Sequence, residues 1–226
     1  MLRIALLSGI LITNSLALAD PESYNRVDFQ VETGREVNND LLIANMAVDI
    51  QDKEPGRVAR SINTALNEAL KKAVSFDTIK ASSGNQNTYP VYGKNNQIDA
   101  WRGHGEIRLE SRNFKAASEL IMQLQSSLQL SGVQFTLAPD THSQIENELI
   151  AEAIKAFQTR ADVIRLAVGA KSYKTVHFSI NSVGNSSRPV PMLRSMAMTA
   201  TAIPAPEFSG GDSRLTVQIN GTIETQ

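Results

Sequence analysis

Every second residue from Leu42 to Ile50 is apolar, and the positions between them include Asn45 and Asp49. This period of two is typical of a strand with one buried face. Pro55 then stands where a helix can begin, and apolar residues recur at helical spacing over the residues that follow, up to position 74. The pattern predicts a strand followed by an amphipathic helix that covers one face of a sheet.

The same pattern recurs over the next sixty residues. We predict a strand near residues 77–83, a long Gly/Asn-rich hairpin connection, and a long strand over residues 98–112. Asn113 is placed to cap a second helix, whose apolar stripe extends to Leu128 and for which Gly132 is the predicted stop.

A fourth strand, with Val133, Phe135 and Leu137 alternating, completes the first half of the chain at residues 40–138. The order β-α-β-β-α-β is that of the split βαβ pattern, in which two helices cover one face of an antiparallel sheet. The predicted fold class is therefore α+β with a ferredoxin-like core.

A long helix over residues 141–168 opens the second part of the chain, and Thr141 and Gln144 have the spacing of a capping box at its start. This helix carries two adjacent apolar seams, which include Ile150 and Phe157. So wide an apolar surface predicts burial on more than one side, either between the two halves of the fold or against another subunit.

Strands are expected over residues 24–33, 173–181 and 214–224, and the middle one should turn Val176, Phe178 and Ile180 inward. Together with the long helix they make the second half of a single domain over residues 20–226.

Residues 182–212 form an extended Gly/Ser/Pro/Met-rich loop in this prediction. Met192 and Met196 in this loop join Ile150 and Phe157 as candidate contact residues, because flexible methionines adapt to partner surfaces as well as to gaps in a core.

The first nineteen residues have the features of a secretory signal peptide. Arg3 precedes a mostly apolar run, and Ala17-Leu18-Ala19 provides the small-x-small pattern before Asp20. The run is shorter than the roughly 20 residues of a spanning helix, and no later stretch is apolar enough to span a bilayer. We therefore expect a cleaved periplasmic protein without a transmembrane segment.

The chain contains no cysteine, which excludes disulfides, Cys-ligated zinc and the lipid-bearing cysteine of a lipoprotein. Without Arg3, the 22 basic residues become 21, against 23 acidic ones. Because this balance creates no broad cationic field, we expect neither nucleic acid nor anionic membrane as a partner.

The densest group of ionisable residues is Arg102, His104, Glu106, Arg108 and Glu110, which alternate with smaller or apolar residues. Period two places all five on one face of a strand. That face is either a binding surface or subunit contact, or a solvated face opposite the helices, and the second is the commoner arrangement in one-sided antiparallel sheets.

No catalytic, cofactor or metal motif is complete. The fragment His104-x-Glu106 lacks the cysteines of a zinc deaminase, and His142 and His177 have no metal-ligand spacing. No serine stands in a nucleophile motif. We therefore predict no cofactor, no metal site and no enzymatic activity.

The whole pattern resembles the SIMPL-domain family, exported proteins of unknown function. The resemblance rests on the signal peptide, the strand around Trp101, the succession of Gly132, Val133 and Phe135, an Ala/Arg-rich helix and a Pro-rich tail. The helix and tail residues are Ala153, Ala156, Arg160, Ala161, Leu166, Ala167, Gly169, Pro189-Val190-Pro191-Met192, Arg194, Pro204 and Pro206. The resemblance implies an envelope location, a tendency to oligomerise and a link to stress tolerance, and it brings no catalytic residues.

Our first hypothesis is a non-enzymatic envelope protein that works as an oligomer or interaction module. The alternatives are a periplasmic module that binds a small molecule or metal at the His104 strand face, and an unrecognised hydrolase.

Overall fold

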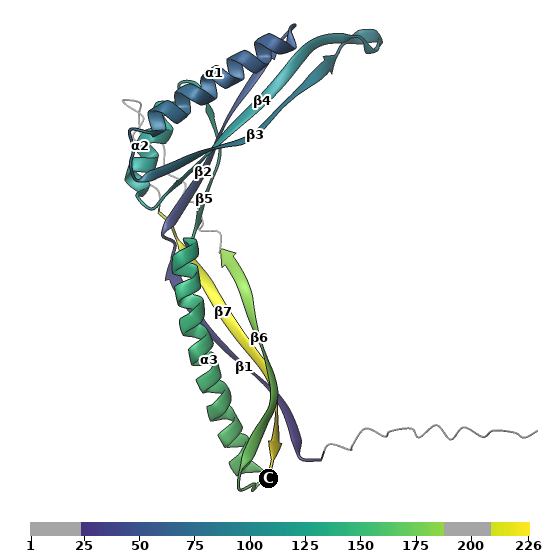
Figure 1. Cartoon of the computed structure of the whole chain (residues 1–226), viewed down its shortest axis with the longest axis vertical. Coiled ribbons are helices and arrows are strands. Elements are labelled where there is room, and N and C mark those ends of the chain that lie inside the picture. Colours follow the sequence, from purple (N-terminus) through teal and green to yellow (C-terminus); the bar gives the residue numbers. More distant parts are fainter. Residues whose placement is uncertain (1–23, 188–208) are drawn as a thin grey trace, which may run out of the picture.

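The computed structural model describes residues 24–187 and 209–226, which form three α-helices and seven strands. In chain order these are β1 (Arg26–Asn38), β2 (Leu41–Asp52), α1 (Pro55–Ala73), β3 (Ile79–Tyr92), β4 (Ile98–Ser111), α2 (Phe114–Leu124), β5 (Gln129–Thr136), α3 (Pro139–Ala167), β6 (Tyr173–Ser187) and β7 (Asp212–Thr225). Figure 1 shows an elongated, bent molecule with two halves, each built on its own sheet.

The first half is a four-stranded antiparallel sheet with the order β3-β4-β2-β5. The first β-α-β unit is β2-α1-β3, and β4 lies between its two strands. The second is β4-α2-β5, and β2 lies between its two strands. Helices α1 and α2 cover one face of this sheet, on the outer side of the bend (Figure 1). The α+β prediction with a split βαβ core is confirmed.

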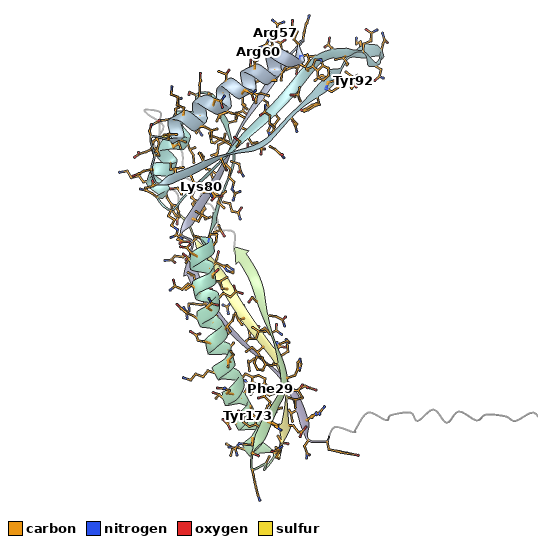
Figure 2. All side chains as sticks on the ribbon, viewed as in Figure 1. Phe29, Arg57, Arg60, Lys80, Tyr92 and Tyr173 are labelled. Carbon is orange, nitrogen blue, oxygen red and sulfur yellow. The ribbon has the colours of Figure 1, made fainter. Side chains whose placement is uncertain are left out.

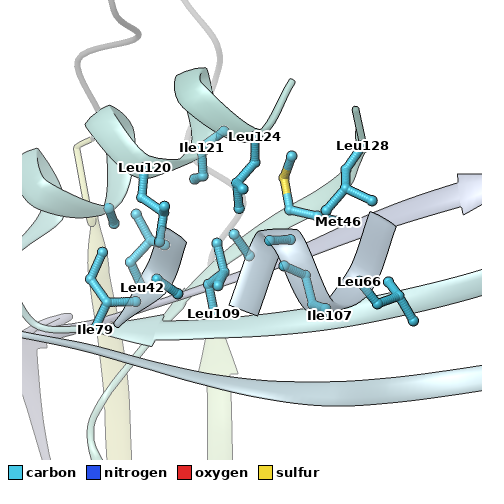
Figure 3. Packing of buried hydrophobic residues seen from close by; sticks show 14 of the residues in the cluster. Leu42, Met46, Leu66, Ile79, Ile107, Leu109, Leu120, Ile121, Leu124 and Leu128 are labelled. Atoms are coloured by element: carbon cyan, nitrogen blue, oxygen red, sulfur yellow. The ribbon is translucent and has the colours of Figure 1, made fainter. Parts of the chain in front are cut away.

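The core of the first half lies between the two helices and the sheet, and Figure 3 shows side chains of both meeting there. It depends on the period-two pattern, because Leu42 and Met46 of β2 lie on the helix face, as do Ile107 and Leu109 of β4. All four are fully buried. Burying a side chain of this size stabilises a fold by about 1.5–3 kcal/mol.

Gly105 of β4 lies directly beneath α1. A Cβ atom at Gly105 would approach Cγ2 of Ile62 to 2.5 Å and Cδ1 of Leu66 to 3.0 Å. The glycine in the alternating strand therefore lets α1 come close to the sheet, and the helix side chains occupy the space that a side chain of β4 would fill.

The second half is a three-stranded antiparallel sheet with the order β1-β7-β6, and α3 packs on one face of it. Leu215, Val217, Ile219 and Ile223 of β7 are buried against this helix. Phe157 of α3 lies over Gly221 and stacks on Phe29 of β1, with ring centroids 4.5 Å apart. Strand β1 is therefore held to the second half by its pairing with β7 and by the contact of Phe29 with α3.

The structure corrects several boundaries of the first half. Helix α2 ends at Leu124, and Gly132, which we took as its stop, lies inside β5. Strand β3 continues through the Gly/Asn-rich stretch to Tyr92, although most of its side chains there are exposed. Pairing with β4 over almost its full length holds this edge strand extended despite its polar sequence.

The start of α3 also differs from the prediction. The helix begins at Pro139, and its N-cap Ala138 has no side-chain cap, so Thr141 and Gln144 do not form the predicted capping box. Instead, the carboxylate of Asp40 accepts hydrogen bonds from the backbone N–H of Ala138 at 2.7 Å and from the hydroxyl of Thr141 at 2.6 Å. A carboxylate suits the positive end of the helix dipole, so the β1–β2 connection caps α3 from a distance in sequence.

The two halves meet at the short connection between β1 and β2. Asn39 donates its side-chain amide to the carbonyl of Gly210 at 2.8 Å and accepts a hydrogen bond from the Ser213 hydroxyl at 2.6 Å. Arg112 forms an ion pair with Asp140 beside the Asp40 cap. Polar contacts of four separate chain segments therefore hold this joint.

Strand β6 departs most from expectation. It extends to Ser187 and β7 begins at Asp212, so both ends of the stretch predicted as a loop over residues 182–212 belong to strands, and residues 188–208 lie outside the described residues. The register places Phe178 beside Gly221 and Ile180 beside Ile219, on the face that carries α3. These side chains nevertheless remain 44% and 36% exposed, and Val176 at an adjacent bulge is 44% exposed. Phe178 and Ile180 therefore do turn toward the α3 face, as predicted, but they are not fully covered there, because α3 lies mainly over β1 and β7.

Helix α3 packs on the three-stranded sheet alone and does not lie between the two halves (Figure 1). We predicted that the wide apolar surface of α3 is buried on a second side, either between the two halves of the fold or against another subunit. In the part of the chain that the structure describes, α3 is not buried between the two halves.

Candidate functional site

The candidate site is the face of the four-stranded sheet that α1 and α2 leave uncovered. Arg102, His104, Glu106 and Arg108 all project from this face of β4, and each is only partly buried or exposed. Their neighbours on β2 follow from the antiparallel register, which pairs His104 with Asp49 and Arg102 with Gln51. The four predicted residues therefore do share one surface, on the inner side of the bend.

His104 is the centre of this surface. Its Nδ1 lies 3.0 Å from Oδ1 of Asp49, and its Nε2 lies 2.8 Å from Oε1 of Glu106. The hydrogen bond with Glu106, followed by the one with Asp49, raises the pKa of His104 above its usual value, against a smaller opposing effect of burial. The protonated ring donates to both carboxylates, so each ring nitrogen is already occupied.

The flanking arginines are also paired. Arg102 donates to the side-chain oxygen of Gln51 at 3.0 Å, and Arg108 donates through Nε to Oε1 of Glu110 at 2.8 Å. His104 and Arg108 are thus each paired with a carboxylate, and Arg102 is paired with an amide oxygen. Such a surface can accept a polar partner only by exchanging these contacts for new ones of similar strength.

The three histidines of the chain lie apart from one another. His104 belongs to the first half, whereas His142 lies in the first turns of α3, 3.7 Å from Glu146, and His177 is exposed on β6. Within residues 24–187 and 209–226, no three His, Asp or Glu side chains gather in a way that could hold a metal ion.

An open cleft of about 930 Å³ lies at the joint between the halves. Lys80, Arg112, Phe114 and Asp140 are among the residues that line it, and Figure 2 shows Lys80 near the bend. Its arginine is engaged with Asp140, and the wall is shared by β3, β4 and the starts of α2 and α3. Of the five ionisable residues on the predicted face, only Glu110 is among those that line this cleft. The sequence did not predict the cleft itself, because it arises where segments far apart in sequence meet.

The predicted contact residues have different positions. Phe157 is 3% exposed and is enclosed by its own sheet, so we assign it to the core. Ile150 is half-buried at the margin of the same core. Met192 and Met196 lie outside the described residues.

Comparison with known proteins gives one family. SIMPL, described as a protein of unknown function (DUF541), matches residues 27–223. The chain belongs to the SIMPL family. The match covers both halves of the fold, from β1 into β7. No match was found among curated proteins, and in the part of this SIMPL protein that the structure describes, no helix combines the length and hydropathy needed to cross a bilayer.

Sequence reasoning missed Asp49 as a member of the SIMPL candidate site. Asp49 stands on the polar side of β2, which the alternation indicates, but more than fifty residues separate it from His104. Only the β2–β4 register brings the two together. Asn87 of β3 is the neighbour of His104 on the other side for the same reason.

The His104 contacts predict a pH-dependent stability. Because the folded pKa of His104 is raised, its stabilising effect is present below the unfolded pKa of about 6.5 and is lost as the pH rises through the folded pKa. We expect His104→Gln to lower the free energy of unfolding by about 1 kcal/mol near pH 5.5 and by much less near pH 9. Urea unfolding of both proteins across this range measures the difference.

The matched control is the double variant Asp49→Asn, Glu106→Gln, which keeps the histidine and removes both carboxylates. It should lose the same pH-dependent part of the stability. A His104→Gln effect of constant size from acid to alkaline pH would contradict the assignment.

Proposed function

We propose that this protein is an exported, non-enzymatic envelope protein that works by self-association, as a structural or interaction module linked to stress tolerance. The signal-like residues 1–19 support export. Membership of a family of unknown function adds no activity that would argue against this proposal.

The observation that carries the proposal is the apolar margin of the second half. Val176, Phe178 and Ile180 of β6 are all at least one-third exposed. On the same face of the neighbouring strand β7, the side chains of Val217, Ile219 and Ile223 are buried, and position 221 is glycine. Contiguous exposed apolar side chains of this kind mark contact surfaces in proteins that are otherwise polar outside.

The alternative functions receive less support. A ligand-binding module at the His104 face would have to break contacts that already satisfy His104, Arg102 and Arg108. A metal ion would compete with the proton that both Asp49 and Glu106 favour on the ring. A hydrolase needs an activated nucleophile, and no serine hydroxyl among the described contacts is bonded to a histidine.

The experiment is the solution mass of the chain from Asp20 onward, measured by light scattering on a size-exclusion column over a concentration series. We expect a mass of two or more chains that persists at low micromolar protein. A single-chain mass throughout the series would overturn the proposal, and ligand-dependent thermal stabilisation would then test the His104 face.

A further inference from the structure

Strand β6 forms one edge of the three-stranded sheet, and among the described residues its only strand neighbour is β7 (Figure 1). The pairing is irregular between Thr175 and His177 and again between Val183 and Ser186. Between these irregularities, residues 177–183 pair one to one with β7. This regular stretch presents a row of backbone N–H and C=O groups on its outer side, which is a template for another strand.

The other sheet edges carry the features that prevent such pairing. Strand β1 has the exposed charges Asp28, Glu32 and Glu36 along its length. Strand β3 has a bulge and contains Pro90, and β5 has only 8 residues. Charge, proline, bulges and short length are the usual means of blunting an edge. Residues 177–183 contain no lysine, carboxylate or proline, so the edge of β6 is left open.

The apolar side chains next to this open edge form a strip with the near flank of α3. Glu148 and Glu152 reach Arg35 on β1 at 2.5 and 2.6 Å, so that flank of α3 faces β1. Ile150 lies two residues after Glu148, and Ile154 lies two residues after Glu152, which is about 200° around the helix in each case. The two isoleucines therefore lie on the opposite flank of α3, toward β6.

Phe178 extends this strip from the helix to the sheet edge, since its ring lies 5.9 Å from that of Phe157. Whatever pairs with β6 therefore also meets an apolar surface.

We propose that β6 pairs in antiparallel orientation with β6 of a second copy of this chain, about a two-fold axis at Ser179, which joins two three-stranded sheets into one of six strands. This inference rests on the self-association proposed above and specifies its geometry. The two-fold axis makes the contact isologous, so that each strand presents the same residues to the other.

The sequence of β6 is complementary to itself in this register. Phe178 of each copy comes opposite Ile180 of the other, on the apolar side, and these are favourable cross-strand pairs. His177 comes opposite Asn181. The two Lys174 residues are ten positions apart along the strands, roughly 33 Å, so no like charges meet.

Ser179 provides a direct test because it would lie opposite its own copy. It is exposed on the face away from α3, and its hydroxyl makes only a long contact of 3.5 Å to the carbonyl of Asn220. Ser179→Lys and Ser179→Glu should each weaken the dimer on the order of tenfold, because like charges then stand directly opposite. An equimolar mixture of the two variants should recover the wild-type dissociation constant within about threefold, through Lys–Glu pairing across the axis.

Gln30 is the matched control, because it lies in the same row of the sheet, paired with the same Asn220, but on the β1 edge. Gln30→Lys and Gln30→Glu should leave the dimer as it is. Light scattering over a concentration series measures all five proteins and the mixture.

The outcomes separate the two proposals. A monomeric wild type would overturn self-association, and this pairing with it. A multimeric wild type whose mass survives both Ser179 substitutions would leave self-association standing and overturn the β6 pairing, as would equal effects at Gln30; the edge of β6 would then be covered by other residues of the same chain or not at all.

Discussion

Replacing Gly105 by alanine is expected to lower the free energy of unfolding by about 2–3 kcal/mol, which is a large effect for one added methyl group. The new Cβ would lie 2.5 Å from Cγ2 of Ile62, a side chain with no exposed surface. That methyl group is fixed to the β-branched carbon of Ile62 and can move only if the side chain changes rotamer or α1 shifts. Urea unfolding of the wild type and the variant gives the change directly.

The control is Gly132→Ala in β5 of the same sheet, where an added Cβ would meet nothing within 4 Å. We expect its stability to stay within about 0.5 kcal/mol of the wild type. If the two alanine variants had equal stability, close packing of α1 on the glycine strand would not be the reason for glycine at position 105.

The elements that the sequence predicted well are those with a local cause. The strand around Leu42 and helix α1 were both predicted correctly because each has a clear local pattern of apolar residues, with a period of two in the strand and of 3.6 in the helix. In both elements this pattern marks the one face that is buried. The exposed part of β3 was missed because its polar residues carry no periodic signal. Its conformation depends on hydrogen bonds with β4, which the residues of β3 alone do not reveal.

Contacts between distant segments account for most of the other differences. The cap of α3 comes from Asp40, 98 positions before Ala138, so a search for a local capping box at Thr141 could not find it. In the same way, His104 was recognised as the centre of a polar face, whereas its partner Asp49 was not. A period-two pattern gives the face on which a residue lies, but not the register that selects its neighbour.

The second half shows how an apolar pattern can be interpreted in two ways. Phe157 was predicted as a contact residue because it widens the apolar surface of α3, and the structure encloses it between Phe29 and Phe178. The space for its ring exists because position 221 is glycine, where a Cβ would lie 2.6 Å from Cε2 of the ring. By contrast, Phe178 and Ile180 were predicted to turn inward and do lie on the α3 face, yet they remain 44% and 36% exposed. The extent of a helix across a sheet, rather than hydrophobicity, decides which of these residues reach the surface.

Phe157 is also expected to be the largest single contributor to the stability of the second half. We expect Phe157→Ala to lower the free energy of unfolding by about 3–5 kcal/mol, because the truncation leaves a cavity above Gly221 and removes the stacking on Phe29. The second half has its own apolar cluster, separate from that of the first. Hydrogen exchange should therefore show protection lost first in β1, β6, β7 and α3, while β2 and β4 keep theirs.

Leu166→Ala on the exposed side of the same helix is the control, and we expect it to change the free energy of unfolding by less than about 0.5 kcal/mol. A Phe157→Ala loss below about 1 kcal/mol would instead mean that the ring is not packed in this core.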